Sequence, residues 1–392
     1  MNNIYSNHNH LKKNVLIVYH YFAHYRLPII QELSHDKDIS YFFISGKTTN
    51  KDITIIDSST FIDNKINWKT VKNIWIFNKR LLWQTGIIRE CLSGNYDCVI
   101  FLGTPQFIST WLAAIILRLI GKHTLFWTHG IIRDKFRDKV KIIFLKLANG
   151  LLIYGNWAKN RLIQFGFKPE HLYVIYNSLD YKNQVKIRGT LSPDMLLSKR
   201  RSYFSNPDFP ILLFIGRLTL QKKLDQLIIA CEKLHQMGLS TNLLFIGDGE
   251  DKQKLIELCQ SKNLQDYITF YGESYDEHEN APLIAMADIC VSPGDIGLTA
   301  IHALTYGTPV ITHNNPFQQM PEFEAITHGK TGMFFEYGSI NSLIDVIFSW
   351  LKNNKYNRED IRKDCYETID NYYNPAYQAK VIKEAVMNYI KD

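Results

Sequence analysis

The stretch from Asp288 to Ile326 constrains the fold more than any other part of this 392-residue chain. It opens with a short apolar strand at 289–292, turns at Pro293-Gly294, continues as a helix and ends in a second strand at 310–312. This order is the repeating unit of a parallel α/β sheet. In such sheets the turn after the carboxyl end of a strand faces the ligand crevice. We therefore expect this stretch to form one wall of a binding site.

The helix of this stretch begins near Gly297 and Leu298, directly after the glycine-rich turn. Amide groups at a helix N-terminus favour an anion. Asp295 lies at the mouth of the turn, and His302 follows seven residues later on the same helix. Both side chains are therefore expected to touch a bound ligand.

Strands alternate with helices along both halves of the chain, which predicts the α/β fold class with a doubly wound parallel sheet in each half. A polar, basic and turn-rich segment separates the halves. We expect a first domain at 1–185, a linker at 186–209, a second domain at 210–372 and a C-terminal helix at 373–392 that packs back toward the first domain. The expected strands are 14–19, 39–45, 98–102, 123–128, 151–154, 172–175, 211–215, 242–246, 268–271, 289–292, 310–312 and 333–335.

Composition and motif content narrow the class of protein. Hydrophobic residues make up 46% and charged residues 21% of the chain, as in soluble enzymes, and the net charge of +7 indicates an anionic partner only weakly. No G-x-G-x-x-G follows the first strand, which argues against a dinucleotide-dependent dehydrogenase. The six cysteines are scattered, which fits buried thiols in a reducing cytoplasm. The N-terminus lacks an apolar signal segment, and the longest apolar run, 111–120, is too short to span a membrane.

Two cations follow the first strand of the second half. Arg217 comes directly after Gly216 at the end of strand 211–215, and Lys222 follows five residues later. An arginine fork and a lysine stabilise the growing negative charge of a diphosphate leaving group without a metal. A solvated pair of cations at a helix start explains the spacing equally well.

Two further signals are weaker. Gly247-Asp248-Gly249 is a tight turn that would let the backbone approach a ligand, although an ordinary strand-to-helix turn explains it as well. His129 ends the apolar strand at 123–128, so its ring should project from the carboxyl edge of the sheet. A structural role for this histidine is about as well supported as a functional one.

Asp36-Lys37-Asp38 matches the Asp-x-Asp pattern with which metal-dependent sugar transferases bind Mn²⁺ or Mg²⁺. It falls between the first helix and the second strand, away from the expected crevice. We therefore interpret it as a solvated turn and expect no metal site.

The segment 133–146 is basic at one end and apolar at the other, so it could lie on an anionic membrane surface. Its basic residues include Lys135, Arg137, Lys139 and Lys141, and nearby Phe107, Trp111, Phe126 and Trp127 keep this interpretation open. The alternative, slightly favoured, is a solvated helix that packs through Val140, Ile143, Phe144 and Leu147.

Several motifs occur together in the second half. They are G-R-L-x-x-x-K at 216–222, G-D-G at 247–249, S-P-G-D-I-G-L-T-A-I-H-A-L-T-Y-G-T-P-V-I-T at 292–312, P-E-x-E-A-I at 321–326 and G-K-T-G at 329–332. In this combination they resemble the GT-B-fold retaining glycosyltransferases of family 4, also called group 1. Y-R-L-P-I at 25–29, W-T-H-G at 127–130 and V-I-Y-N-S-L-D at 174–180 extend the resemblance more loosely into the first half. It implies two Rossmann-like domains that face each other across a cleft.

The resemblance implies roles for individual residues. Arg217 and Lys222 would hold the donor diphosphate in catalysis, and His129 would reach in from the acceptor domain. The residues implied in donor binding are Gly216, Gly247, Gly249, Gly272, Glu273, Asp295, Gly297, Leu298, Thr299, His302 and Glu322. Most of the family carries Glu-x7-Glu where this chain has Asp295 and His302. An imidazole has at most one acceptor nitrogen, so ribose recognition by His302 must differ.

The implied reaction transfers a sugar from a UDP- or GDP-sugar to an acceptor hydroxyl with retained configuration and without a cofactor or metal. The expected acceptor is a glycan or lipid-linked glycan of bacterial surface polysaccharide or lipopolysaccharide synthesis, and no nucleic acid is expected as a partner. Two alternatives stay open: a nucleotide-sugar-binding protein without catalysis, which His302 favours, and a GT-B sugar-nucleotide epimerase. We expect a cytoplasmic protein, with peripheral attachment to the inner face of the cell membrane as an alternative.

Overall fold

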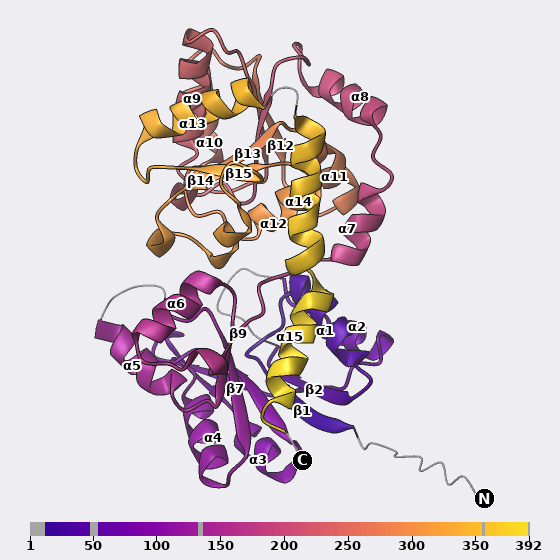
Figure 1. Cartoon of the computed structure of the whole chain (residues 1–392), viewed down its shortest axis with the longest axis vertical. Helices are drawn as coiled ribbons and strands as arrows, with labels where there is room; N and C mark the ends of the chain where they lie inside the picture. The colour runs from indigo at the N-terminus through magenta and orange to yellow at the C-terminus, as the bar shows by residue number, and fades with distance from the viewer. Residues whose placement is uncertain (1–11, 48–53, 132–135, 355–356, 391–392) are drawn as a thin grey trace, which may run out of the picture. The chain divides into compact units, whose positions relative to one another are not determined.

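The computed structural model describes residues 12–47, 54–131, 136–354 and 357–390, with the backbone alone for 136–138. The chain divides into two compact units, each with its own sheet (Figure 1). Unit 1 comprises Met1–Ile175 and Pro375–Asp392, and unit 2 comprises Tyr176–Asn374. The chain therefore passes from one unit to the other twice.

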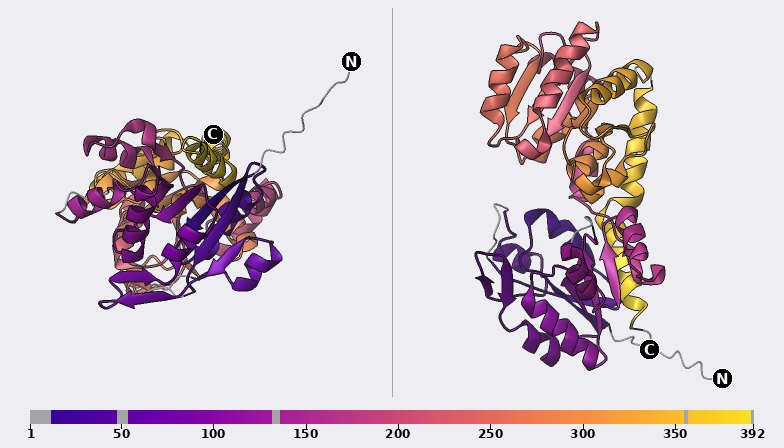
Figure 2. Two further views of the ribbon diagram at one scale, coloured as in Figure 1. Left: turned by 90° about the horizontal axis from the view of Figure 1, so that it is seen from below. Right: turned by 90° about the vertical axis from the view of Figure 1, so that its left-hand side faces the viewer.

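Unit 1 is built on a seven-stranded parallel sheet in the order β3-β2-β1-β6-β7-β8-β9. Side chains of β1 alternate between its faces, so that Val15 and Ile17 join one core and Leu16 and Val18 the other. Helices α1 and α15 cover the first face, and α3, α4 and α5 cover the second (Figure 2). The strands are β1 Lys13–Val18, β2 Ile39–Ser45, β3 Trp68–Thr70, β6 Cys98–Leu102, β7 His123–Thr128, β8 Gly150–Ile153 and β9 Leu172–Val174, and β4 Asn73–Ile76 and β5 Leu81–Gln84 form an antiparallel pair. The helices are α1 Leu27–Ser34, α2 Ser58–Asp63, α3 Ile87–Ser93, α4 Ile108–Leu119, α5 Phe136–Leu145, α6 Asn156–Gln164 and α15 Pro375–Met387.

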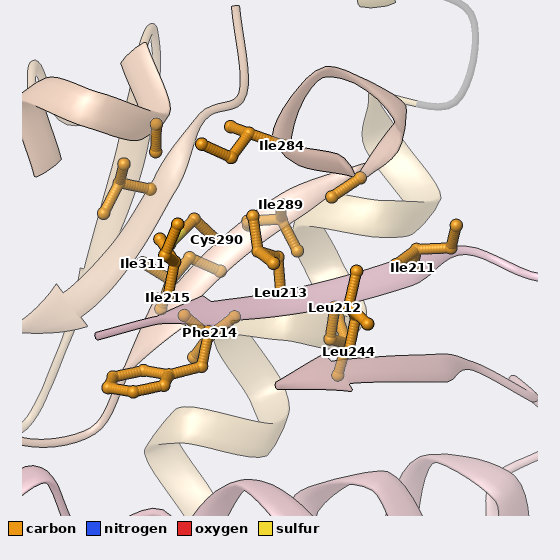
Figure 3. Close-up of a cluster of buried hydrophobic side chains, with 14 of the residues drawn as sticks. Ile211, Leu212, Leu213, Phe214, Ile215, Leu244, Ile284, Ile289, Cys290 and Ile311 are labelled. Carbon is orange, nitrogen blue, oxygen red and sulfur yellow. The ribbon is translucent and has the colours of Figure 1, made fainter. Parts of the chain in front are cut away.

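Unit 2 is built on a six-stranded parallel sheet in the order β12-β11-β10-β13-β14-β15. Every residue of β10 and β13 is buried, because helices cover both faces of the sheet. Figure 3 shows Leu213 and Phe214 of β10 beside Ile289 and Cys290 of β13 and Ile311 of β14. The strands are β10 Ile211–Ile215, β11 Asn242–Ile246, β12 Ile268–Gly272, β13 Ile289–Ser292, β14 Val310–His313 and β15 Gly332–Phe335.

The helices of unit 2 pack in two groups, one for each face of the sheet (Figure 1). Helix α9 packs against α10 and α13, while α12 packs against α7 and α14, and α11 packs against α7 and α8. The apolar stripe of α9 is buried from Leu227 to Leu234, as is Leu224 directly before the helix. The helices are α7 Tyr181–Arg188, α8 Pro193–Tyr203, α9 Asp225–Gln236, α10 Lys252–Ser261, α11 Glu277–Met286, α12 Thr299–Thr305, α13 Ile340–Asn353 and α14 Arg358–Tyr372.

The structure divides the chain at places other than residues 185 and 210. Unit 2 already begins at Tyr176, and the segment 186–209, predicted as a linker, contains the end of α7 and all of α8 within this unit. Arg200 on α8 donates to the carbonyl groups of Pro207 and Phe209 and pairs with Asp288 at 3.0 Å. The basic residues that made this segment read as a solvated linker therefore anchor it to the second sheet.

The C-terminal helix α15 completes unit 1. Ile382, Ala385 and Val386 are fully buried in the core that contains α1. Lys383 on the same helix pairs with Asp36 at 3.1 Å and with Asp38 at 2.5 Å. The Asp-x-Asp sequence, predicted to be a solvated turn, is thus an ion-paired attachment point for α15.

The cysteines behave as the sequence predicts. All six are buried and none forms a disulfide. Burial raises the pKa of the Cys98 and Cys290 thiols to about 12, which keeps them protonated and unreactive.

Candidate functional site

The strand order of unit 2 reverses between β10 and β13, which are neighbours in the sheet although two strands separate them in sequence. Ligands of open α/β sheets bind outside the carboxyl ends of the strands at such a switch point. The loop 216–222 follows β10, and the turn 293–297 follows β13. The motif residues of these two segments therefore lie at the position where this fold offers a site.

The turns around this point pack backbone against backbone. A Cβ atom on Gly247 would lie 2.0 Å from the Gly216 oxygen, and one on Gly294 would lie 2.1 Å from the Gln221 oxygen. Gly249 approaches Leu218 in the same way, at 2.3 Å from its oxygen. The turn 247–249 was predicted to let the backbone approach a ligand, and the structure packs Gly247 and Gly249 against the loop 216–222. They fix the loop that carries Arg217 and Lys222.

The two predicted cations have different surroundings. The Lys222 ammonium donates to the Asp295 carbonyl oxygen at 2.6 Å and pairs with the Asp295 carboxylate at 3.1 Å. Arg217 is exposed, and within the described ranges no hydrogen bond or ion pair engages its guanidinium. Lys222 is thus held in place by the β13 turn, whereas Arg217 is available to an anion.

The loop after β12 lies close to Arg217. The hydroxyl group of Tyr275 donates a hydrogen bond to Glu273. This bond raises the pKa of Tyr275, and the positive charge of Arg217 opposes the rise. Gly272 has a positive φ of 99°, and nothing lies within 4 Å of the place where its Cβ would be. Gly272 and Glu273, which were predicted to bind the sugar donor, therefore lie on a loop close to Arg217.

The start of α12 is tied to β10. Gly297 takes a positive φ of 56°, Leu298 caps the helix and the Thr299 hydroxyl donates to the Ile215 carbonyl at 2.8 Å. The Ile296 amide donates to the side chain of the buried Gln319 at 3.0 Å. The sequence offered no signal for Gln319, which orders this turn from a distance of 23 residues along the chain.

His302 on α12 faces an acidic partner that the sequence did not reveal. Its Nε2 atom lies 2.8 Å from the Glu277 carboxylate at the start of α11. The Tyr306 hydroxyl donates to the same carboxylate at 2.6 Å, and the Gln184 amide at 3.1 Å. Burial alone raises the pKa of Glu277, but the hydrogen bonds from His302, Tyr306 and Gln184 outweigh it and lower the pKa to about 2. Glu277 is therefore a carboxylate at any ordinary pH.

Two buried residues lie farther along the motif region. Glu322 is 2% exposed and accepts a hydrogen bond from the Asn177 amide at 2.8 Å. His313, at the end of β14, is 1% exposed, and its Nδ1 atom accepts from the Asn315 amide at 3.2 Å. Burial and the nearby Lys223 charge lower the pKa of His313 to about 4, so the ring is neutral at pH 7. The sequence analysis did not single out His313, because a lone histidine at a strand end carries no specific signal.

In unit 1, His129 lies at the carboxyl edge of the sheet, as its strand-end position predicts. Its ring centroid is 4.6 Å from that of Tyr154, whose hydroxyl accepts a hydrogen bond from Arg26. The Arg26 guanidinium also lies 5.3 Å from the centre of the Trp127 ring, within cation–π range. A cavity of about 480 Å³ opens beside His129 and is lined largely by apolar and small side chains together with Lys141.

An exposed apolar surface lies on the helices next to this cavity. Ile108, Leu112, Ile115 and Leu119 recur along α4 at helical spacing and are 37% to 81% exposed. Val140 and Ile143 on α5 are 48% and 61% exposed. We call these six residues the α4–α5 apolar surface.

This surface differs from the one predicted for the segment 133–146. Arg133, Asp134 and Lys135 lie outside the described residues, as does the side chain of Arg137. Phe107, Phe126 and Trp127 are buried in the core, not at the surface. Val140 and Ile143, predicted to pack, are exposed, whereas Phe144 and Leu147 pack against the core as predicted. Leu145, which was not predicted to pack, is also buried.

Among the described residues, no three His, Cys, Asp or Glu side chains lie close enough to share a metal ion. In the same ranges, no helix has the length and apolar character needed to cross a bilayer.

Comparisons with known proteins agree with this placement. Residues 197–368 match the family model described as Glycosyl transferases group 1. An O-antigen biosynthesis glycosyltransferase from Escherichia coli is 26% identical over 238 residues, which cover 58% of this chain and 60% of that protein. The chain spans between 29% and 60% of the length of the curated relatives it matches. The match to the family model lies entirely within unit 2, Tyr176–Asn374.

Solved structures match nearly the whole chain. A glycosyltransferase from Rickettsia africae is 17% identical, with a TM-score of 0.73, over 97% of this chain and 99% of that one. An Anabaena protein in complex with UDP is 15% identical, with a TM-score of 0.70, over 96% and 100%. These likenesses establish the fold, and the GT-B fold class predicted from the sequence is confirmed.

Proposed function

We propose that this protein is a retaining glycosyltransferase that moves a sugar from a nucleoside diphosphate sugar to an acceptor hydroxyl. One observation carries the proposal: Arg217 and Lys222 both lie on the loop after β10, at the β10–β13 switch point of the unit that matches the group 1 glycosyltransferase model. Arg217 is free of protein hydrogen bonds among the described residues, and Asp295 holds Lys222 in position. This pair supports binding of a diphosphate.

The proposed chemistry needs little from the protein besides positive charge. As the bond to the sugar breaks, the diphosphate gains negative charge, which Arg217 and Lys222 would stabilise. A phosphate oxygen of the donor would take the acceptor proton, so no carboxylate pair is required for this step. His129, at the cavity in unit 1, would orient the acceptor. No step of this scheme calls for a metal ion or a cofactor.

The test is a transfer assay on a panel of UDP- and GDP-sugars with glycan and lipid-linked acceptors, read by mass spectrometry. Arg217→Ala should lower donor affinity by about tenfold or more, because hydrogen bonds to charged groups contribute roughly 1.5–3 kcal/mol each. Arg201→Ala, at an exposed arginine on α8, is the matched control and should behave as the wild type. The proposal fails if neither transfer nor donor hydrolysis occurs across the panel. Tight donor binding without any turnover would favour the non-catalytic alternative.

His129→Ala separates the two sides of the proposed reaction. We expect a loss of kcat far larger than the loss of donor affinity, because His129 belongs to unit 1 and the donor residues belong to unit 2. An unchanged kcat would make His129 a structural residue.

We further propose that the acceptor is lipid-linked and that the protein meets it at an anionic membrane surface, as in bacterial surface glycan synthesis. The α4–α5 apolar surface supports this, since large groups of exposed apolar side chains mark interaction sites. Arg118 and Lys139 lie on the same two helices and suit an anionic headgroup layer. The cavity beside His129 is lined by Val140 of this surface.

Flotation with phosphatidylglycerol liposomes tests the membrane surface. Replacing Leu119 and Ile143 together by serine should release the protein from the liposomes, because it removes two of the most exposed apolar side chains. Ile62→Ser is the matched control, since Ile62 is 74% exposed on α2 and does not belong to this surface. Flotation that persists in the double variant, or that never occurs in the wild type, contradicts the proposal.

A further inference from the structure

We propose that Glu277 is a positioning residue that fixes the tautomer of His302, so that the second ring nitrogen accepts a hydrogen bond from a hydroxyl group of the donor nucleotide. The inference rests on the proposed function, because it takes the nucleotide to lie at the β10–β13 switch point. It assigns a role to the histidine that stands at 302 and to an acidic residue 25 positions earlier.

The first step concerns the nitrogen that faces Glu277. One carboxylate oxygen, Oε1, lies 2.8 Å from His302 Nε2, 2.6 Å from the Tyr306 hydroxyl and 3.1 Å from the Gln184 amide. An ionised carboxylate only accepts hydrogen bonds. His302 Nε2 must therefore carry a proton, as the other two partners do.

The second step concerns the other nitrogen. In a neutral imidazole one nitrogen donates and the other accepts. The inference takes the ring to be neutral, so that with the proton on Nε2 the Nδ1 atom is the acceptor; no hydrogen bond joins Nδ1 to any residue in the described ranges. The His302 side chain keeps 16% of its surface exposed. A hydroxyl group is a fitting partner for Nδ1, whereas a carbonyl oxygen is not.

The third step places this acceptor along α12. Thr299, one helical turn before His302, is bonded to the end of β10, and Asp295 holds Lys222 just before the helix. Residues three apart lie on one helix face, about 5 Å apart along the axis. His302 thus lies about one helical turn beyond the start of α12, near which the cations would bind the phosphates. The part of the nucleotide that would reach His302 is the part that carries the hydroxyl groups.

The fourth step explains why a carboxylate beside the ring is needed. Without Glu277, the proton could move between the two ring nitrogens, and half of the hydrogen-bonding arrangements would present a donor to the ligand. Gln184 on α7 and Tyr306, directly after α12, each donate to the Glu277 carboxylate, so the loss of the Tyr306 bond still leaves the Gln184 bond to hold the carboxylate toward the ring. A histidine with a fixed tautomer then offers one acceptor of defined direction.

Three variants test the inference. Glu277→Gln keeps the shape of the side chain, but an amide can donate or accept and no longer dictates the tautomer. His302→Phe removes the acceptor. Tyr306→Phe is the matched control, because it removes another hydrogen bond to the same oxygen without changing which nitrogen of His302 faces an acceptor. The readouts are ¹⁵N NMR of the imidazole nitrogens, and calorimetric titration with UDP, GDP and their 2′-deoxy and 3′-deoxy forms.

We expect the wild type to show Nε2–H and to bind one of the diphosphates about three- to tenfold more tightly than at least one of its deoxy forms, the size of one neutral hydrogen bond. Glu277→Gln and His302→Phe should lose this discrimination, and Tyr306→Phe should keep it. Combining Glu277→Gln with His302→Phe should cost no more than His302→Phe alone, because Glu277 acts through the ring.

Two results would overturn the inference: an Nδ1–H tautomer in the wild type, or discrimination that survives Glu277→Gln. If neither UDP nor GDP binds the wild type, the proposed function fails, and with it the ligand assigned to Nδ1. In that case the NMR comparison still decides whether Glu277 sets the tautomer.

Discussion

Replacing Gly247 by alanine tests whether the close packing of the turns holds the cationic loop in place. The added Cβ would lie 2.0 Å from the Gly216 oxygen and 2.9 Å from its carbonyl carbon, well inside the roughly 3.5 Å of a favourable contact. Both atoms belong to the backbone, so no side chain can rotate away. Gly247 also has a φ of 142°, where a non-glycine residue costs about 1–3 kcal/mol by itself.

Gly247→Ala is expected to lower the free energy of unfolding by about 3–5 kcal/mol in total, at the upper end of the effects of single substitutions. A unit of about 200 residues loses roughly 2–4 °C of Tm per kcal/mol, so Tm should fall by about 6–20 °C. Gly238→Ala is the matched control, because Gly238 has a positive φ of 79° but nothing within 4 Å of its Cβ position. We expect this control to lower the free energy of unfolding by about 1–2 kcal/mol and Tm by a few degrees.

Differential scanning calorimetry of the full chain measures both variants, and calorimetric titration with UDP and GDP follows the site. Gly247→Ala should also weaken diphosphate binding, since its turn supports the loop that carries Arg217 and Lys222. If Gly247→Ala unfolds at the same temperature as Gly238→Ala, the backbone contact does not matter and the reasoning is refuted.

Three further outcomes follow from the structure. The Glu277 carboxylate has a lowered pKa, so its contribution to the free energy of unfolding is complete above about pH 4.5 and is lost as the pH falls toward 2. Urea unfolding should show a loss of stability on the order of 2–3 kcal/mol over this range, and Glu277→Gln should lack this loss. Because all six cysteines are buried, Ellman's reagent should find almost no reactive thiol in the native protein and six in guanidinium, and rapid native labelling would contradict this. Lys383→Met should lower stability by about 1 kcal/mol or less, since its pairs with Asp36 and Asp38 are partly exposed, and Lys380→Met, at a more exposed lysine of the same helix, should have no effect in the same unfolding assay.

The parallel strands were the most predictable part of the fold. Strands 211–215, 242–246 and 289–292 were placed to the residue, because an apolar run buried on both faces ends at a glycine turn. The place of the segment 186–209 within unit 2 was not predicted, because its cations pair with residues such as Asp288 that are distant in sequence. Helix α5 shows a finer failure: its pattern predicted a helix, but neighbouring elements decide that Phe144 is buried and Ile143 is exposed.

The candidate site was also predictable only in part. Arg217, Lys222 and Asp295 were predicted from residue type and strand-end position, and the structure places them at one switch point. The partnership of His302 with Glu277 was not predictable, since Glu277 begins another helix and carries no motif. Lys222 was expected to hold the donor diphosphate, and only the structure reveals that Asp295 holds Lys222.

Helix α15 gives the chain an unusual order of assembly. Proteins are synthesised from the N-terminus, and their domains fold as they emerge from the ribosome. The sheet of unit 1 is made first, yet Ile382 and Val386, which belong to its interior, are translated only after all of unit 2. A nascent chain halted before residue 375 would therefore carry a finished unit 2 and a unit 1 with α1 still uncovered, a natural target for a chaperone until α15 is made.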